Sequence, residues 1–183
     1  MEAVWVAGCS GYETTGVILL LKGCGVSVRL FRPGERLRAG DTLILCFSSA
    51  PLLGWWRYLK ITQWVAYRYD IRLIVLCPDE VCRTDVVCGR NIVTVNGERS
   101  CIHLSLSLQQ TVQRCLPDGM PESQWDCVKS FLERASQTLR IFPVQESEDS
   151  AIRRAYQKRD LMVQRLGFVS LMRLKVFMAG HLP

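Results

Sequence analysis

TLILCF at residues 42–47 is almost wholly apolar, the pattern of a short strand that is buried on both faces. Further short apolar runs flank it in the chain, at 3–7 (AVWVA), 26–31 (VSVRLF), 72–77 (RLIVLC) and 91–95 (NIVTV). Stretches of helical length alternate with these runs, at 12–22, 53–69, 79–87 and 106–116, with a short helix or turn at 33–40. This alternation predicts an α/β fold, a five-stranded parallel sheet with helices on both faces.

The alternation of strands and helices in the sequence ends after residue 116. Residues 117–121 (PDGMP) are rich in turn-forming residues and predict a linker. No convincing strand pattern follows, and helices are expected at 122–135, 150–166 and 170–178. Between the first two of these, residues 136–145 give no clear pattern, and Pro143 ends or kinks any helix there. We therefore expect an α/β domain at 1–116, a linker at 117–121 and a small all-helical domain at 122–183.

The net charge of +6 is unevenly distributed along the chain. The residues after 150 carry seven basic side chains and a single acid, Asp160. In the 150–166 helix, Ile152 and Leu166 belong to an apolar stripe, while Arg154 and Lys158 fall on the opposite side. A concentrated positive field suits a polyanion such as nucleic acid; a solvated helix face without a ligand is the other interpretation.

The nine cysteines are odd in number and include no C-x-x-C spacing. The only histidines, His103 and His181, complete no cysteine cluster at ligand spacing, so no metal site is predicted. We expect the cysteines to be structural thiols in a reduced compartment, with metal binding and redox sensing as the alternatives. No apolar run approaches the roughly 20 residues of a membrane span, and no basic n-region opens the chain. We expect a cytoplasmic protein with no membrane partner.

Catalytic and cofactor motifs are missing from the sequence. Gly8, Cys9, Ser10 and Gly11 follow the first strand, but they match neither G-x-G-x-x-G nor a phosphate loop with its lysine. A nucleophilic triad needs a histidine base, and the sequence has only two histidines, so no credible triad is predicted. We therefore predict no catalytic residues, no cofactor and no enzymatic activity, and keep a small α/β enzyme or nucleotide binder as the least favoured alternative.

The stretch RAYQKRDLMVQRLGF at residues 154–168 resembles the recognition helix and following turn of the LuxR/NarL helix-turn-helix family. The family pattern is a basic helix, two apolar residues, two polar or basic residues, Leu-Gly and a short last helix. Residues 122–132 resemble the first helix of the same unit. The resemblance implies a helix-turn-helix DNA-binding domain in the last 60 or so residues.

The first part of the chain resembles the receiver of a response regulator, without its chemistry. Gly8, Cys9 and Ser10 stand where receivers have an acidic pair, and Phe47-Ser48-Ser49 stands where they have the phospho-accepting aspartate. The expected lysine after the fifth strand is replaced by a turn, NGER at 96–99. The whole chain is similar to atypical LuxR-type regulators of enteric bacteria, such as the auxiliary regulators of capsule and fimbriae. This implies action without phosphorylation, as a homodimer or paired with another LuxR-type regulator.

On this resemblance, the partner of the basic helix is double-stranded DNA. Residues expected in the major groove or on phosphates are Arg153, Arg154, Gln157 and Lys158, with Arg165 on a phosphate. Arg159 falls within the apolar stripe and reaches a phosphate only by snorkelling outward. Arg173 and Lys175 are weaker candidates.

A second hypothesis from a different class remains open. In it the chain is a protein-interaction module that modulates a DNA-binding regulator without binding DNA itself. Trp55 and Trp56 point to different sides of one predicted helix, so we expect that a single core does not bury both fully. This exposure predicts that the first 117 residues drive association. Salt-dependent binding of duplex DNA distinguishes the regulator from the interaction module.

Overall fold

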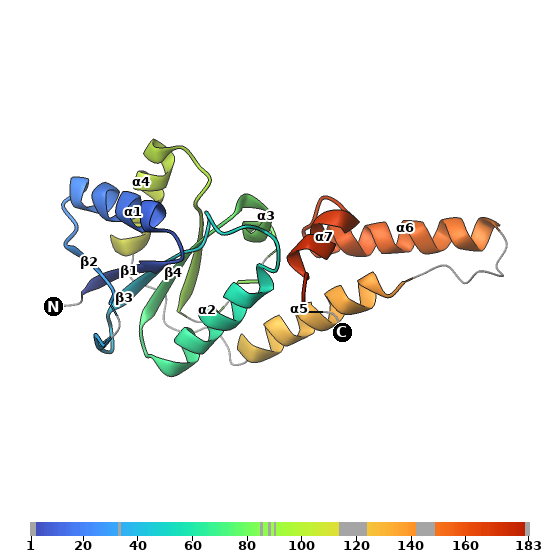
Figure 1. The fold of residues 1–183 in the computed structure, drawn as a ribbon, viewed down its shortest axis with the longest axis horizontal. Helices are drawn as coiled ribbons and strands as arrows, with labels where there is room; N and C mark the ends of the chain where they lie inside the picture. Colours follow the sequence, from blue (N-terminus) through green and yellow to red (C-terminus); the bar gives the residue numbers. More distant parts are fainter. Residues whose placement is uncertain are drawn as a thin grey trace.

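The computed structural model describes residues 3–32, 34–84, 86–87, 89, 91–113, 124–141 and 149–181 (Figure 1). Its centre is a sheet of five parallel strands in the order β2-β1-β3-β4-β5. The strands are β1 (Val4–Gly8), β2 (Val28–Leu30), β3 (Thr42–Cys46), β4 (Arg72–Cys77) and β5 (Ile92–Asn96). The predicted five-stranded parallel sheet is confirmed. Its strands β3 and β4 are buried along nearly their whole length, as their continuous apolar runs require.

Two helices cover one face of the sheet. They are α1 (Gly11–Gly23) and α4 (Cys101–Gln113), whose buried side chains meet Val6, Ile44 and Ile74 of the strands. Ser10 caps α1 by accepting a hydrogen bond from the Glu13 amide at 3.5 Å. The predicted helix at 106–116 thus begins five residues earlier, at Cys101.

The opposite face carries α2 (Trp56–Arg68) and α3 (Asp79–Cys82). The helix expected at 79–87 is only one turn long, because the Thr84 hydroxyl and amide both donate to the Val81 carbonyl and turn the chain. The described residues between 33 and 40 form turns rather than a helix.

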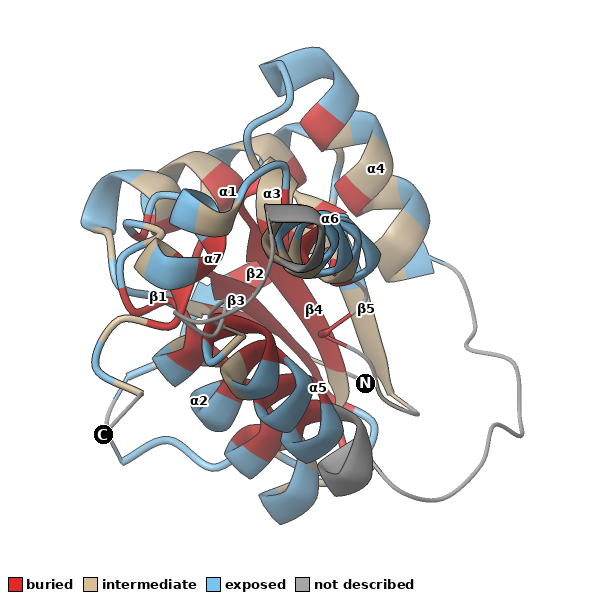
Figure 2. Cartoon of the chain, turned by 90° about the vertical axis from the view of Figure 1, so that its right-hand side faces the viewer, coloured by how far each residue is buried: buried red, intermediate tan, exposed pale blue. Residues whose placement is uncertain are grey.

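Three further helices follow, α5 (Gln124–Leu139), α6 (Asp149–Arg165) and α7 (Leu171–Phe177). The predicted linker at 117–121 and Pro143 lie outside the described residues. The three helices share a single apolar cluster with α2 and the second face of the sheet. Its members from this part of the chain include Val128, Phe131, Val163, Leu166, Phe168, Leu174 and Phe177. Figure 2 shows buried residues at the centre of the sheet and a mostly exposed α6.

Both tryptophans at the start of α2 are buried, which corrects the expectation that one core does not enclose them. Trp55 is 0% exposed and Trp56 8% exposed. The Trp55 indole N–H donates to the Phe47 carbonyl at 3.2 Å, and the Trp56 indole N–H donates to the Ala179 carbonyl at 2.8 Å. The C-terminal helices provide the second buried side, so these two residues supply no exposed surface for association.

Candidate functional site

The crevice at the carboxyl ends of β1 and β3 is where doubly wound folds bind ligands. β1 pairs with β2 on one side and with β3 on the other, so the strand order reverses between β1 and β3. In the loop after β1, the Cys9 thiol lies 3.8 Å from the Cys46 carbonyl oxygen at the end of β3. Ser48 and Ser49, in the loop after β3, contact Glu13 near the start of α1. This edge of the sheet also holds the positions at which the receiver resemblance led us to look for acidic residues.

The carboxylate of Glu13, from the first turn of α1, occupies this crevice. Its Oε1 accepts a hydrogen bond from the Ser48 amide at 3.0 Å, and its Oε2 accepts one from the Ser49 amide at 3.1 Å. Both serine hydroxyls donate to the same two oxygens. An anion in the first turn of a helix is favoured by the helix dipole, and bonds to a charged acceptor are strong. The loop after β3 is therefore held by a carboxylate from the chain itself.

Sequence reasoning missed the role of Glu13, although a signal for it was present. Ser10 and Glu13 have the S-x-x-E spacing of a capping box, in which the glutamate returns to the cap residue. Here its oxygens instead reach two residues from another strand end, 35 and 36 positions away. Gly97, from the turn after β5, packs so tightly on Ser48 that a Cβ there would collide with the serine side chain. The turn that stands in place of the receiver lysine therefore packs directly on Ser48.

The second candidate site is the outer face of α6. Arg154, Lys158 and Arg165 are exposed there, as the apolar stripe predicted, and Arg153 and Gln157 are exposed as well. The helix turns this face outward because Val163 of its other face, and Leu166 directly after its end, are buried in the shared core. A shallow groove of about 430 Å³ follows the basic face and is lined by Arg154, Gln157, Lys158, Leu161, Met162 and Arg165.

Arg159 and Arg173 are held by contacts within the protein. Arg159 has a side chain that is only 16% exposed, with its guanidinium 4.7 Å from the centre of the Tyr156 ring and 4.0 Å from Asp160. Arg173, named as a weaker candidate, forms an ion pair with Glu80 of α3 at 2.7 Å. Neither geometry is that of a cation presented to a ligand.

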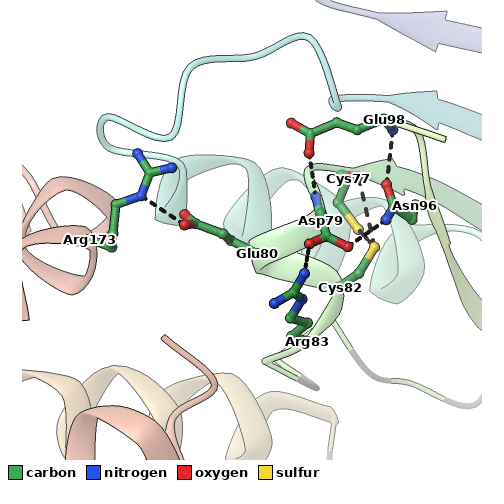
Figure 3. Close-up of polar contacts among 8 residues, drawn as sticks. All are labelled: Cys77, Asp79, Glu80, Cys82, Arg83, Asn96, Glu98 and Arg173. Carbon is green, nitrogen blue, oxygen red and sulfur yellow. Dashed lines mark hydrogen bonds and ion pairs between the residues drawn. The ribbon is translucent and has the colours of Figure 1, made fainter. Parts of the chain in front are cut away.

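The short helix α3 connects the sheet to the C-terminal helices (Figure 3). Its Asp79 carboxylate accepts a hydrogen bond from the Asn96 side chain at 2.7 Å and pairs with Arg83. The Asp79 amide donates to Glu98 at 3.1 Å, which attaches the start of α3 to the turn after β5. Through the Glu80–Arg173 pair, the same four-residue helix contacts α7.

An apolar groove of about 790 Å³ lies between α2 and α5. Val128, Leu132 and the 56% exposed Trp64 provide its apolar lining, with Lys60 and Arg140 among the polar residues. His181 also lines the groove. Burial first, and then the nearby Lys60, lower the pKa of His181, which favours the neutral imidazole. Sequence reasoning did not predict this groove, because the lining residues of α2 and α5 are 64 or more positions apart in the chain.

Within the described residues, no cluster of three or more His, Cys, Asp or Glu side chains is arranged to hold a metal ion. In the same part of the chain, none of the helices has the length and apolar character needed to cross a membrane.

No family model matches this chain, and no curated protein matches it in sequence. Among solved structures, the chain is similar to the regulatory domain of the master biofilm regulator CsgD. The two are 16% identical with a TM-score of 0.46, over 62% of this chain and 88% of that one.

Proposed function

We propose that this protein is a transcriptional regulator that binds double-stranded DNA through the basic face of α6 and acts without phosphorylation of its receiver-like sheet. The observation that carries the proposal is the exposure of the predicted basic residues on one face of one helix. Arg154, Lys158 and Arg165 lie on that face, at intervals of four and seven residues. A helix of this kind fits the major groove of B-DNA, where arginine and glutamine read base edges and lysine binds phosphate.

The packing of α6 supports this use of its face. The carboxyl end of the helix is anchored by Val163 and by Leu166, the residue after its end, whereas Arg153 and Arg154 lie in the amino half and Lys158 near the middle. In Figure 1, the amino half of α6 lies farther from the sheet than its carboxyl half. Rigid anchoring at one end and exposure at the other favour a defined orientation on a ligand.

The contents of the β1/β3 crevice support action without phosphorylation. Acyl-phosphate chemistry needs an aspartate nucleophile and a divalent cation held by carboxylates. Ser48 stands after β3, and its amide and hydroxyl are bonded to Glu13. We expect no stoichiometric, hydroxylamine-sensitive label from acetyl phosphate.

The test is binding of the full chain to a fluorescent duplex of random sequence, followed by anisotropy over a salt series. Affinity is expected to fall steeply between about 50 and 200 mM salt, because each phosphate contact releases counterions. The double variant Arg154→Ala/Lys158→Ala should flatten this salt dependence and weaken binding, by about 1–3 kcal/mol for each side chain that contacts a base.

The matched control is Lys22→Ala/Arg36→Ala, which removes the same charge from exposed residues on the receiver-like part. If the two double variants lose the same affinity, net charge alone explains binding and α6 is not the DNA-reading element. If the folded wild-type chain binds no duplex at low salt, the proposal is wrong.

The protein-interaction alternative is favoured by one observation, the exposed apolar side chains of α2. Ile61, Trp64 and Tyr67 are each at least 45% exposed, and Trp64 borders the α2/α5 groove. Under this alternative, a second copy or another regulator covers them. Sedimentation of the full chain should then show association that Trp64→Ala weakens; a concentration-independent monomer for both proteins argues against self-association.

A further inference from the structure

Two cysteines meet beside α3. Cys77 is the last residue of β4 and Cys82 the last residue of α3, and their sulfur atoms are 3.1 Å apart (Figure 3). Pro78 makes this possible, because its extended conformation turns the chain so that α3 starts at once and brings Cys82 back over the strand end. A disulfide bond is about 2.0 Å long, so the two sulfurs need to approach by only about 1 Å.

The two thiols differ in their surroundings. Cys77 is 0% exposed at the end of a central strand, while Cys82 is half-buried. The hydrogen bond with Cys82, followed by burial, raises the pKa of the Cys77 thiol. The same hydrogen bond lowers the pKa of Cys82, against the opposing effects of burial and Asp79, with Arg99 assisting. Cys82 is the more accessible of the two, and its pKa is shifted down while that of Cys77 is shifted up, so we expect Cys82 to ionise and react first.

We propose that Cys77 and Cys82 form a peroxide-reactive dithiol that closes to an intramolecular disulfide, with Cys82 as the attacking and Cys77 as the resolving thiol. This inference is independent of DNA binding. It rests on the sulfur–sulfur contact, on the difference in burial and on the position of the pair at a strand–helix turn.

The oxidant is a hydroperoxide, of which hydrogen peroxide is the simplest. The Cys82 thiolate attacks one peroxide oxygen, the O–O bond breaks, and Cys82 becomes a sulfenic acid while hydroxide leaves. The Cys77 sulfur then attacks the Cys82 sulfur, the S–O bond breaks, and water leaves with the proton of Cys77. Two electrons pass from the dithiol to the peroxide, and an external thiol reverses the reaction.

Trypsin makes the pair easy to follow, because Arg72 and Arg83 enclose both cysteines in one peptide, LIVLCPDEVCR at 73–83. The full chain is treated with hydrogen peroxide, and its remaining free thiols are alkylated under denaturing conditions. The protein is then digested with trypsin, and the peptide masses are measured by mass spectrometry. The expected product is this peptide without alkyl groups and lighter by two hydrogen atoms, and prior reduction restores two alkylated thiols. Its rate of formation should not depend on protein concentration, and should exceed oxidation of the exposed Cys101 by about tenfold or more.

Two variants separate the roles of the sulfurs. In Cys82→Ser, Cys77 should stay reduced while Cys101 oxidises as before. In Cys77→Ala, Cys82 should stop at a sulfenic acid that dimedone traps, a species that does not accumulate in the wild type. The wild-type measurement needs neither variant to fold.

Three results would overturn the proposal. The first is recovery of peptide 73–83 with both thiols alkylatable after Cys101 has been oxidised. The second is a disulfide that joins Cys77 or Cys82 to another peptide. The third is a rate that rises with protein concentration, which indicates bonds between molecules.

Discussion

Replacing Phe177 by alanine should destabilise the central sheet as well as the C-terminal helices. Phe177 is fully buried in α7, and its ring lies 5.2 Å from that of Phe168, 5.9 Å from Phe131 and 6.1 Å from Trp55. These partners come from the α6–α7 turn, from α5 and from the start of α2. The ring therefore stands where the receiver-like part and the C-terminal helices share their core.

The expected loss is about 3–5 kcal/mol, the usual range for truncating a buried phenylalanine. Because the apolar cluster is continuous, the loss should be felt by the whole chain as one cooperative unit. The slowest amides of β3 and β4 exchange only on global unfolding, so their hydrogen exchange should speed up by a factor of about 100 or more. Exchange followed by mass spectrometry, peptide by peptide, measures this directly.

Met172→Ala is the control, since this residue of α7 is exposed and should change exchange little. The reasoning is refuted if Phe177→Ala accelerates exchange in α5, α6 and α7 while β3 and β4 keep their protection. That outcome would make the C-terminal helices an independently unfolding unit.

Four further substitutions test other features of the structure. Glu13→Gln should lower the free energy of unfolding by about 1–3 kcal/mol, measured by urea denaturation. The glutamine NH₂ group cannot accept a hydrogen bond, so it would leave the Ser48 or Ser49 amide without its acceptor. Burial opposes ionisation of Asp41, but hydrogen bonds from three N–H groups prevail and lower its pKa. Because the pKa of Asp41 is lower in the folded state than in the unfolded state, its ionised carboxylate stabilises the fold at pH values above the unfolded-state pKa of about 4. This stabilisation is lost as the pH falls through the folded-state pKa. Asp41→Asn should therefore remove part of the loss in urea midpoint below about pH 4. Gly167→Ala should destabilise by about 1–3 kcal/mol, because φ is +86° and the new Cβ would lie 2.7 Å from the Arg83 carbonyl oxygen. Gly16→Ala, in the middle of α1 with open space around it, should instead stabilise by about 0.5–1 kcal/mol.

The sheet was predictable from the sequence because its signal is local. Central strands such as β3 and β4 are buried on both faces, so nearly every residue in them has to be apolar. Helix ends were less predictable. The end of α3 depends on the hydroxyl of Thr84, and the start of α4 at Cys101 lies before the apolar periodicity used to place it.

The tryptophans of α2 show why the site was harder to predict than the fold. Helical periodicity separates Trp55 from Trp56 but does not say that a segment 123 residues later accepts the indole of Trp56. Cys77 and Cys82 pose the same difficulty, since five residues of separation match no recognised motif. They meet only because the chain turns at Pro78.

The carboxylate that occupies the β1/β3 crevice is tethered to the chain. A free anion binds its donors in proportion to its concentration, whereas Glu13 is delivered to Ser48 and Ser49 by α1 at a fixed effective concentration. The Glu13 carboxylate cannot dissociate into solution, because it is covalently part of the chain. The loop after β3 is therefore held by an anion that the fold itself supplies.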